Sequence, residues 1–178
     1  MMKSVSTICL VLFASLQAAT YESLSGALRK VLPSGQKVFK SKLVLDKAQA
    51  KILNDFGHGD FLADDAIDVY YTKDDKGQVS GTAVHLVEYL VRWKSTHTWV
   101  VGLAPDGKLT GISVVELTDK YAFPLGEAGF LKQFAGKAPP QSLYGKGMDA
   151  VSGASASCQL LSSSIQRAVW ISKNAKLP

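Results

Sequence analysis

Near the end of the chain stands a run of small and hydroxyl-bearing residues, Asp149-Ala150-Val151-Ser152-Gly153-Ala154-Ser155. Its composition is suited to holding a phosphate. Ser152, Gly153 and Ala154 have almost no side-chain bulk, and glycine tolerates positive φ, so backbone N–H groups in this run can approach an anion closely. The hydroxyl of Ser155 closes the run and offers a nucleophilic or hydrogen-bonding oxygen at its end.

Apolar residues beyond the run recur at three- and four-residue spacing, which predicts an amphipathic helix over residues 157–172. Ser155 and Ser157 are both residue types that favour the N-cap of such a helix. An anion at this end would meet unpaired N–H donors and the positive end of the helix dipole, together worth about 0.3–1 kcal/mol. Taken alone, the run is equally compatible with a flexible turn and an ordinary capped helix start.

The run resembles the flavinylation motif of the FMN-binding domain family. That family occurs in peripheral flavin subunits of sodium- and proton-translocating redox complexes and in NosR-like regulators, and the last hydroxyl of its motif carries FMN through a phosphoester bond. The resemblance implies FMN as the cofactor, Ser155 as the attachment site, and Ser152, Gly153 and Ala154 as residues around the phosphate. The opening acid of the motif, here Asp149, is implied to be read by the FAD:protein FMN transferase that attaches the flavin.

Other segments resemble the same family in order and spacing, and together they cover most of residues 22–172. They are the hairpin at 101–111, the Phe-Leu-x-Gln-Phe-x-Gly-Lys segment at 130–137, and the opening segments at 28–33 and 38–40. The acceptor here is serine, whereas threonine is more frequent in the family. The segment at 116–126 matches the family's flavin-contact loop only loosely.

The position of that loop implies that Thr118, Tyr121 and Phe123 line the flavin ring. A flavin ring needs an apolar or aromatic wall and a few hydrogen-bond donors, which these residue types supply. For the two aromatic residues, packing in the protein core is the alternative explanation.

The first residues of the chain have the pattern of a secretory signal peptide. Lys3 precedes an apolar run from Val5 to Leu16, and small residues at Ala18 and Ala19 follow. This run is shorter than the about 20 residues that a membrane span needs, although an uncleaved anchor is a second possibility. We therefore predict a signal peptide over residues 1–19 and an FMN-binding domain over residues 20–178, located in the periplasm or on the extracytoplasmic face of the membrane.

Composition excludes several other functions. The chain has 178 residues, 47% hydrophobic and 20% charged, which suits one domain with a substantial core. Of its two cysteines only Cys158 follows the predicted signal peptide, so no intramolecular disulfide is expected. The basic residues are scattered without interleaved aromatics, which argues against nucleic-acid binding. Neither a metal site nor catalytic residues are predicted, because the histidines lack metal-ligand spacing and no Gly-x-Ser-x-Gly motif is present.

Periodicity predicts an α+β fold in which an antiparallel β meander packs against several helices. The expected helices are residues 22–31, 47–54, 127–134 and 157–172, and Asp46 is expected to cap the second of them. The expected strands are residues 38–44, 67–72, 81–93, 96–103 and 108–116, with a tight turn over residues 104–107.

The function predicted from these features is electron transfer. The chain would carry FMN on Ser155 and exchange electrons with a membrane or periplasmic redox partner, as a carrier more than as an independent enzyme. Two alternatives stay open: a secreted oxidoreductase that holds FMN noncovalently in its own pocket, and a flavin-free module that uses the same fold to bind a partner.

Overall fold

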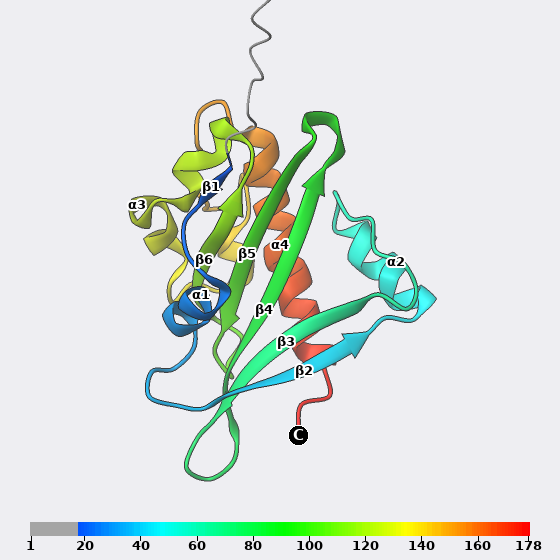
Figure 1. Ribbon diagram of the computed structural model, residues 1–178, viewed down its shortest axis with the longest axis vertical. Helices are drawn as coiled ribbons and strands as arrows, with labels where there is room; N and C mark the ends of the chain where they lie inside the picture. The colour runs from blue at the N-terminus through cyan, green and yellow to red at the C-terminus, as the bar shows by residue number, and fades with distance from the viewer. Residues whose placement is uncertain (1–17) are drawn as a thin grey trace, which may run out of the picture.

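Six antiparallel strands form one open sheet in the computed structural model, which describes residues 18–178 (Figure 1). Their order is β1-β6-β5-β4-β3-β2, so neighbours are consecutive in the chain except where β1 joins β6. The strands are β1 Ala19–Thr20, β2 Val38–Val44, β3 Ala66–Lys73, β4 Val79–Leu90, β5 Ser95–Leu103 and β6 Leu109–Leu117. The predicted α+β architecture, an antiparallel sheet with several helices in a single domain, is confirmed. The predicted signal peptide lies outside the described residues except for Ala18 and Ala19.

Alternating side chains give the sheet two different faces. On β4, Leu86, Glu88 and Leu90 point into the main core, while Val87 and Tyr89 are exposed on the opposite face. This period of two is what an antiparallel strand with one buried face requires. The acidic Glu88 therefore lies among apolar neighbours because of its place in the register.

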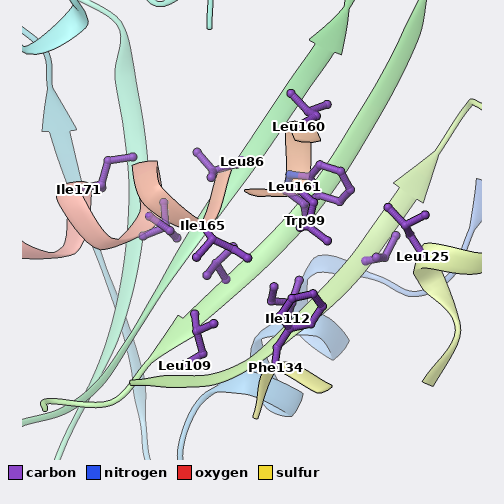
Figure 2. Packing of buried hydrophobic residues seen from close by; sticks show 14 of the residues in the cluster. Leu86, Trp99, Leu109, Ile112, Leu125, Phe134, Leu160, Leu161, Ile165 and Ile171 are labelled. Carbon is purple, nitrogen blue, oxygen red and sulfur yellow. The ribbon is translucent and has the colours of Figure 1, made fainter. Parts of the chain in front are cut away.

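The last helix, α4 Ser155–Asn174, covers the core face of the sheet. Its buried stripe includes Leu160, Leu161 and Ile165, which pack in one cluster with Leu86 and Trp99 of the sheet (Figure 2). Together with Ala168 they recur at spacings of three and four residues, which keep side chains on one side of a helix. The helix thus holds a fixed position over β4 and β5.

Two further helices cover other parts of the molecule. Helix α1, Leu24–Val31, begins at the N-cap Ser23 and buries Leu28 and Val31 in a small second core on the opposite sheet face. Helix α2, Lys47–Asp55, starts with a complete capping box between Asp46 and Gln49. In that box each side chain satisfies a backbone N–H of the other residue. The N-terminal signal predicted at Asp46 is confirmed.

Short helical turns make up much of the remaining chain. They are η1 Val91–Trp93, η2 Lys120–Gly126, α3 Ala128–Leu131, η3 Lys132–Phe134 and η4 Pro139–Ser142. The expected strand over residues 81–93 was wrong at its end, because the chain leaves the sheet after Leu90 to form η1. Within residues 18–178, no helix has the length and apolar character needed to cross a membrane.

Candidate functional site

Ser155 is the first residue of α4, and its side chain is exposed to solvent. The N-cap is Ala154, which has no side-chain oxygen and makes no capping hydrogen bond. The backbone N–H groups of the first turn have no partner within a helix, and no side chain among the described residues accepts from those of residues 155–157. Ser155 is therefore a free hydroxyl beside a set of unpaired donors. The expectation that Ser155 or Ser157 caps this helix was wrong.

The loop that precedes Ser155 has an open backbone. Gly153 has a φ of +81°, and a Cβ atom added there would meet nothing within 4 Å. Ser152 is exposed beside it, whereas the methyl group of Ala154 is buried. Space above Gly153 is what a phosphate needs to approach the main chain. The residues of this loop thus fit a phosphate group.

Asp149, at the start of the motif, is exposed and tied to a distant segment. Its backbone N–H donates to the side-chain oxygen of Gln133 over 2.7 Å. Gln133 in turn donates to the carbonyl of Phe130 at 3.0 Å. Two of the segments that carry the family resemblance, residues 130–137 and the motif, are therefore neighbours in space. The carboxylate of Asp149 has no bonded partner among the described residues, so it is open to another molecule.

Of the predicted ring-binding residues, Thr118 lies between β6 and η2, and Tyr121 and Phe123 lie on η2; they differ in exposure. Thr118 is occupied structurally, since its hydroxyl accepts from the N–H of Thr96 at 2.7 Å and extends the β5–β6 pairing. Tyr121 is 59% exposed. Phe123 is half-buried against the main core, and its carbonyl accepts from Tyr21. Of the three, Tyr121 presents the most accessible aromatic surface.

One hydroxyl connects this loop to the start of α4. The hydroxyl of Ser157, two residues after Ser155, donates to a carboxylate oxygen of Asp119 at 3.3 Å and lies 3.0 Å from Nε2 of His97. The other carboxylate oxygen of Asp119 accepts from the N–H of Tyr121 at 3.0 Å. Asp119 therefore holds the η2 turn and the helix start together, and it places Tyr121 at the end of the molecule where Ser155 lies.

His97 is fully buried, and burial lowers its pKa to about 4, although the carboxylate of Asp119 partly opposes this. The imidazole is neutral at pH 7. With the Ser157 proton directed to Asp119, His97 donates its Nε2–H to the Ser157 oxygen, and Nδ1 keeps an unpaired lone pair. The spacing of the histidines does not predict this cluster. The alternation His97-x-Trp99-x-Val101 on β5 was the available signal, because it places the imidazole on the buried face.

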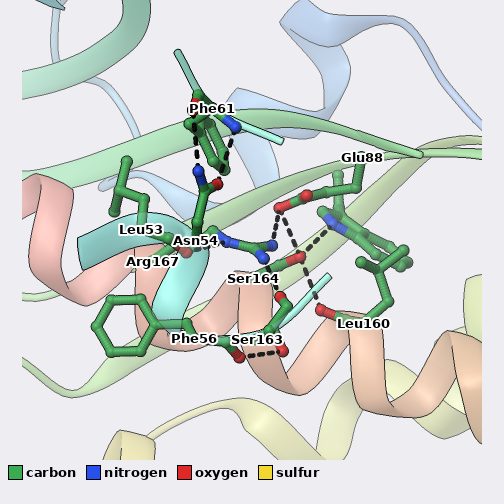
Figure 3. A network of polar contacts seen from close by, with 11 residues as sticks. Leu53, Asn54, Phe56, Phe61, Glu88, Leu160, Ser163, Ser164 and Arg167 are labelled. Carbon is green, nitrogen blue, oxygen red and sulfur yellow. Dashed lines mark hydrogen bonds and ion pairs between the residues drawn. The ribbon is translucent and has the colours of Figure 1, made fainter. Parts of the chain in front are cut away.

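A second buried polar network lies at the middle of α4 (Figure 3). The guanidinium of Arg167 donates to Glu88 at 2.7 Å and to the carbonyls of Leu53 and Gly57. The hydroxyl of Ser164 donates to Glu88 at 2.9 Å and accepts from the indole of Trp99 at 3.1 Å. Burial raises the pKa of Glu88, and the Arg167 charge partly opposes this shift. Every polar group here has a partner, so this network serves to position α4.

Two hollows in the surface lie away from the predicted flavin residues. A groove of about 930 Å³ runs between the β5–β6 turn, η4 and the carboxyl-terminal part of α4, where Trp170 and Val169 line it. A smaller hollow of about 350 Å³ lies between Tyr21 and residues of β6 and α3. Neither is lined by a predicted cofactor-binding residue. Among residues 18–178, no three His, Cys, Asp or Glu side chains gather as a metal site would require.

Comparison with known proteins gave one structural match. No protein-family model matches the chain, and no curated protein matches it. The chain is similar to the crystal structure of Shewanella oneidensis NqrC, with 18% sequence identity and a TM-score of 0.46. The match covers 86% of this chain and 75% of that chain. At this level of similarity it assigns neither a family nor a function.

Proposed function

We propose that this protein is an extracytoplasmic electron carrier with FMN esterified to the hydroxyl of Ser155. The observation that carries the proposal is the exposed, unbonded Ser155 hydroxyl at an uncapped helix start, preceded by the open backbone at Gly153. The resemblance of residues 149–155 to the flavinylation motif supports the choice of FMN over other phosphorylated groups.

The amino-terminal end of α4 suits a phosphodiester in both charge and hydrogen bonding. The free N–H groups of the first turn can donate to phosphate oxygens, and the helix dipole favours a negative charge there. Without a side-chain cap, no carboxylate or hydroxyl competes for these donors. By contrast, the Ser157 hydroxyl is committed to Asp119 and His97 and cannot serve as the acceptor.

Attachment requires a separate flavin transferase with FAD as the donor. The Oγ–phosphorus bond forms at Ser155 while the pyrophosphate bond of FAD breaks, so AMP leaves with the bonding electron pair and the serine proton is released. In this reaction the chain contributes an accessible hydroxyl and, at Asp149, an exposed acid for the transferase to recognise. We assign activation of the hydroxyl to the transferase, because no described side chain accepts the Ser155 proton.

The bound flavin would accept electrons from one redox partner and pass them to another, at the membrane or in the periplasm. Tyr121 offers an exposed aromatic face for the ring, and Phe123 lies beside it on η2. Since Tyr121 is exposed, a ring held against it would lie in an open position. An open ring suits a carrier that must meet its partners closely. Covalent attachment keeps the cofactor from diffusing away.

The test is co-expression with an FAD:protein FMN transferase, followed by intact mass measurement after denaturation. The wild-type chain should gain the mass of one FMN less one water and stay yellow when unfolded. Ser155→Ala should gain nothing, while Ser155→Thr should keep the flavin. Ser34→Ala is the control, because Ser34 is an exposed serine before another glycine of positive φ, Gly35, far from the motif in sequence, and it should be modified like the wild type. Covalent flavin on Ser155→Ala would overturn the proposal.

A second candidate function, noncovalent FMN binding by a secreted oxidoreductase, has the groove beside Trp170 in its favour. Its volume of about 930 Å³ lies within the range of small-molecule sites. In that case the colour should be lost on denaturation, Ser155→Ala should bind flavin normally, and Trp170→Ala should not. These outcomes are the reverse of those expected for the ester.

A further inference from the structure

The β4–β5 tip, residues Val91, Arg92, Trp93 and Lys94, combines exposed apolar side chains with positive charge. Val91 is 74% exposed and Trp93 is 50% exposed, which are large values for residues of these types. Arg92 and Lys94 are also exposed, and the Arg92 guanidinium lies over the Trp93 ring at 5.4 Å. The hairpin end between β4 and β5 projects at one end of the molecule (Figure 1), and its residues line neither of the two surface hollows.

The strand register places this tip at the same edge of the molecule as three other features. Ala19 of β1 pairs with Leu117, which pairs with His97, three residues beyond Lys94. Because β1 runs antiparallel to β6, β1 starts at this edge. Thr118, just before η2, bonds to Thr96 of β5, and Ser157, in the first turn of α4, bonds to His97 of β5, so η2 and α4 both begin at this edge. Figure 1 shows the hairpin end, η2 and the start of α4 at one end of the molecule.

Charge at this edge is predominantly positive. Arg92, Lys94 and Lys120 are exposed, and Lys120 lies over the ring of Tyr121 at 5.1 Å. Two carboxylates of adjoining elements are engaged within the chain: Glu88 pairs with Arg167 inside the core, and Asp119 accepts from Ser157 and Tyr121. Glu116, near the end of β6, is half-buried. The exposed charges of the tip itself, on Arg92 and Lys94, are both positive and favour an anionic surface.

We propose that the β4–β5 tip inserts into the interface of a bilayer that contains anionic phospholipid. Tryptophan and aliphatic side chains beside Lys and Arg are the residue types that bind at the level of lipid headgroups. A projecting tip can insert into a fluid lipid interface. It has no recess of its own that a side chain of a folded partner could fill.

This proposal is independent of the flavin, but the two have a joint consequence. Ser155 is the first residue of α4, which begins at this edge, so a flavin attached there would face the membrane surface. A redox partner embedded in that membrane would then be within easy reach. Failure of one proposal would not entail failure of the other, since lipid contact can be measured on flavin-free protein.

The experiment is quenching of tryptophan fluorescence by brominated lipids, on the full chain added to vesicles of phosphatidylcholine with phosphatidylglycerol. This readout reports the position of Trp93 even if the apolar run alone retains the chain on the vesicles. Trp93→Phe should remove most of the quenching. Trp170→Phe is the matched control at the carboxyl-terminal part of α4 and should leave quenching unchanged, and Trp99 is fully buried in both variants.

Charge is tested by Arg92→Gln combined with Lys94→Gln. On anionic vesicles, quenching of tryptophan fluorescence in this double variant should fall to the level that the wild type shows on pure phosphatidylcholine. Lys37→Gln combined with Lys76→Gln removes two exposed lysines near the opposite end of β4 and should have no effect. The proposal is overturned if Trp93→Phe leaves quenching intact, if no vesicle quenches the wild type, or if both charge variants behave alike. The second outcome would assign the tip to a protein partner.

Discussion

Polar side chains are unbonded at the amino-terminal end of α4 and fully bonded in its middle. In the middle, Arg167 and Ser164 are buried and fully bonded to Glu88, Trp99 and backbone carbonyls. At the amino-terminal end, Ser155 is exposed with no partner, above an uncapped first turn. The first arrangement fixes the helix, and the second leaves donors open to a ligand. Ser157 combines both features. Its hydroxyl is bonded, as are the polar groups in the middle of α4, but it lies only two residues from the unbonded hydroxyl of Ser155.

The largest effect is expected from Arg167→Met. It leaves the Glu88 carboxylate buried without its counter-charge, which costs about 3–5 kcal/mol of unfolding free energy. Denaturant unfolding measures the loss. Lys51→Met is the control, because its pair with Asp55 is exposed and contributes less than about 1 kcal/mol.

Adding Glu88→Gln to Arg167→Met should recover part of the stability, since no charge is then left buried. Equal stability for Arg167→Met and Lys51→Met would contradict the positioning role of the network.

Stability should also fall with acid through His97. Its pKa is lowered from 6.5 to about 4 in the folded protein, so between these values the unfolded chain binds more protons. Stability is therefore complete above about pH 6.5 and declines as the pH falls toward 4, by at most about 3 kcal/mol.

His97→Gln should flatten this part of the stability–pH curve. The control is His58→Gln, in the loop after α2 and outside the buried cluster, which should keep the slope of the wild type. A slope unchanged in His97→Gln would show that His97 is not the group responsible.

Ser157→Ala should destabilise the protein by about 1–3 kcal/mol, because it leaves buried His97 and the Asp119 carboxylate without their shared hydroxyl. Thermal unfolding measures the change. The same variant should also weaken the hold of Asp119 on the N–H of Tyr121. Faster hydrogen–deuterium exchange at that N–H would report this change.

Ser155→Ala should have the smallest effect on stability, within about 0.5 kcal/mol, since the hydroxyl has no partner to lose. The pair Ser155→Ala and Ser157→Ala is a direct test of the contrast along α4. If both variants lost stability equally, the hydroxyl of Ser155 would have a structural role that its exposure does not indicate.

Sequence periodicity predicted the strands well because each has one face in the core. It also identified Asp46, since a capping box depends on residues three positions apart. It failed where long-range contacts decide the structure. The two-residue strand β1 is too short to carry a pattern, and η1 replaces the end of an apolar strand because the chain must turn there to form the hairpin.

The part of the site that lies in one short segment was predictable from the sequence. Ser155, Gly153 and Asp149 belong to one local motif, so their proximity follows from the sequence. The links from Ser157 to His97 and Asp119 join residues up to 60 positions apart, and only the fold reveals them. Thr118 was assigned to the flavin ring from loop position alone, but its hydroxyl bonds to Thr96, which a sequence pattern does not show.

The most direct measurement of the central claim is tandem mass spectrometry of the tryptic peptide 147–167 from protein co-expressed with a flavin transferase. This peptide contains Ser152, Ser155, Ser157 and three further serines, so it reports which hydroxyl is modified. We predict the FMN mass on Ser155 alone. A flavin located on any other serine, or an unmodified peptide despite an active transferase, would contradict the assignment.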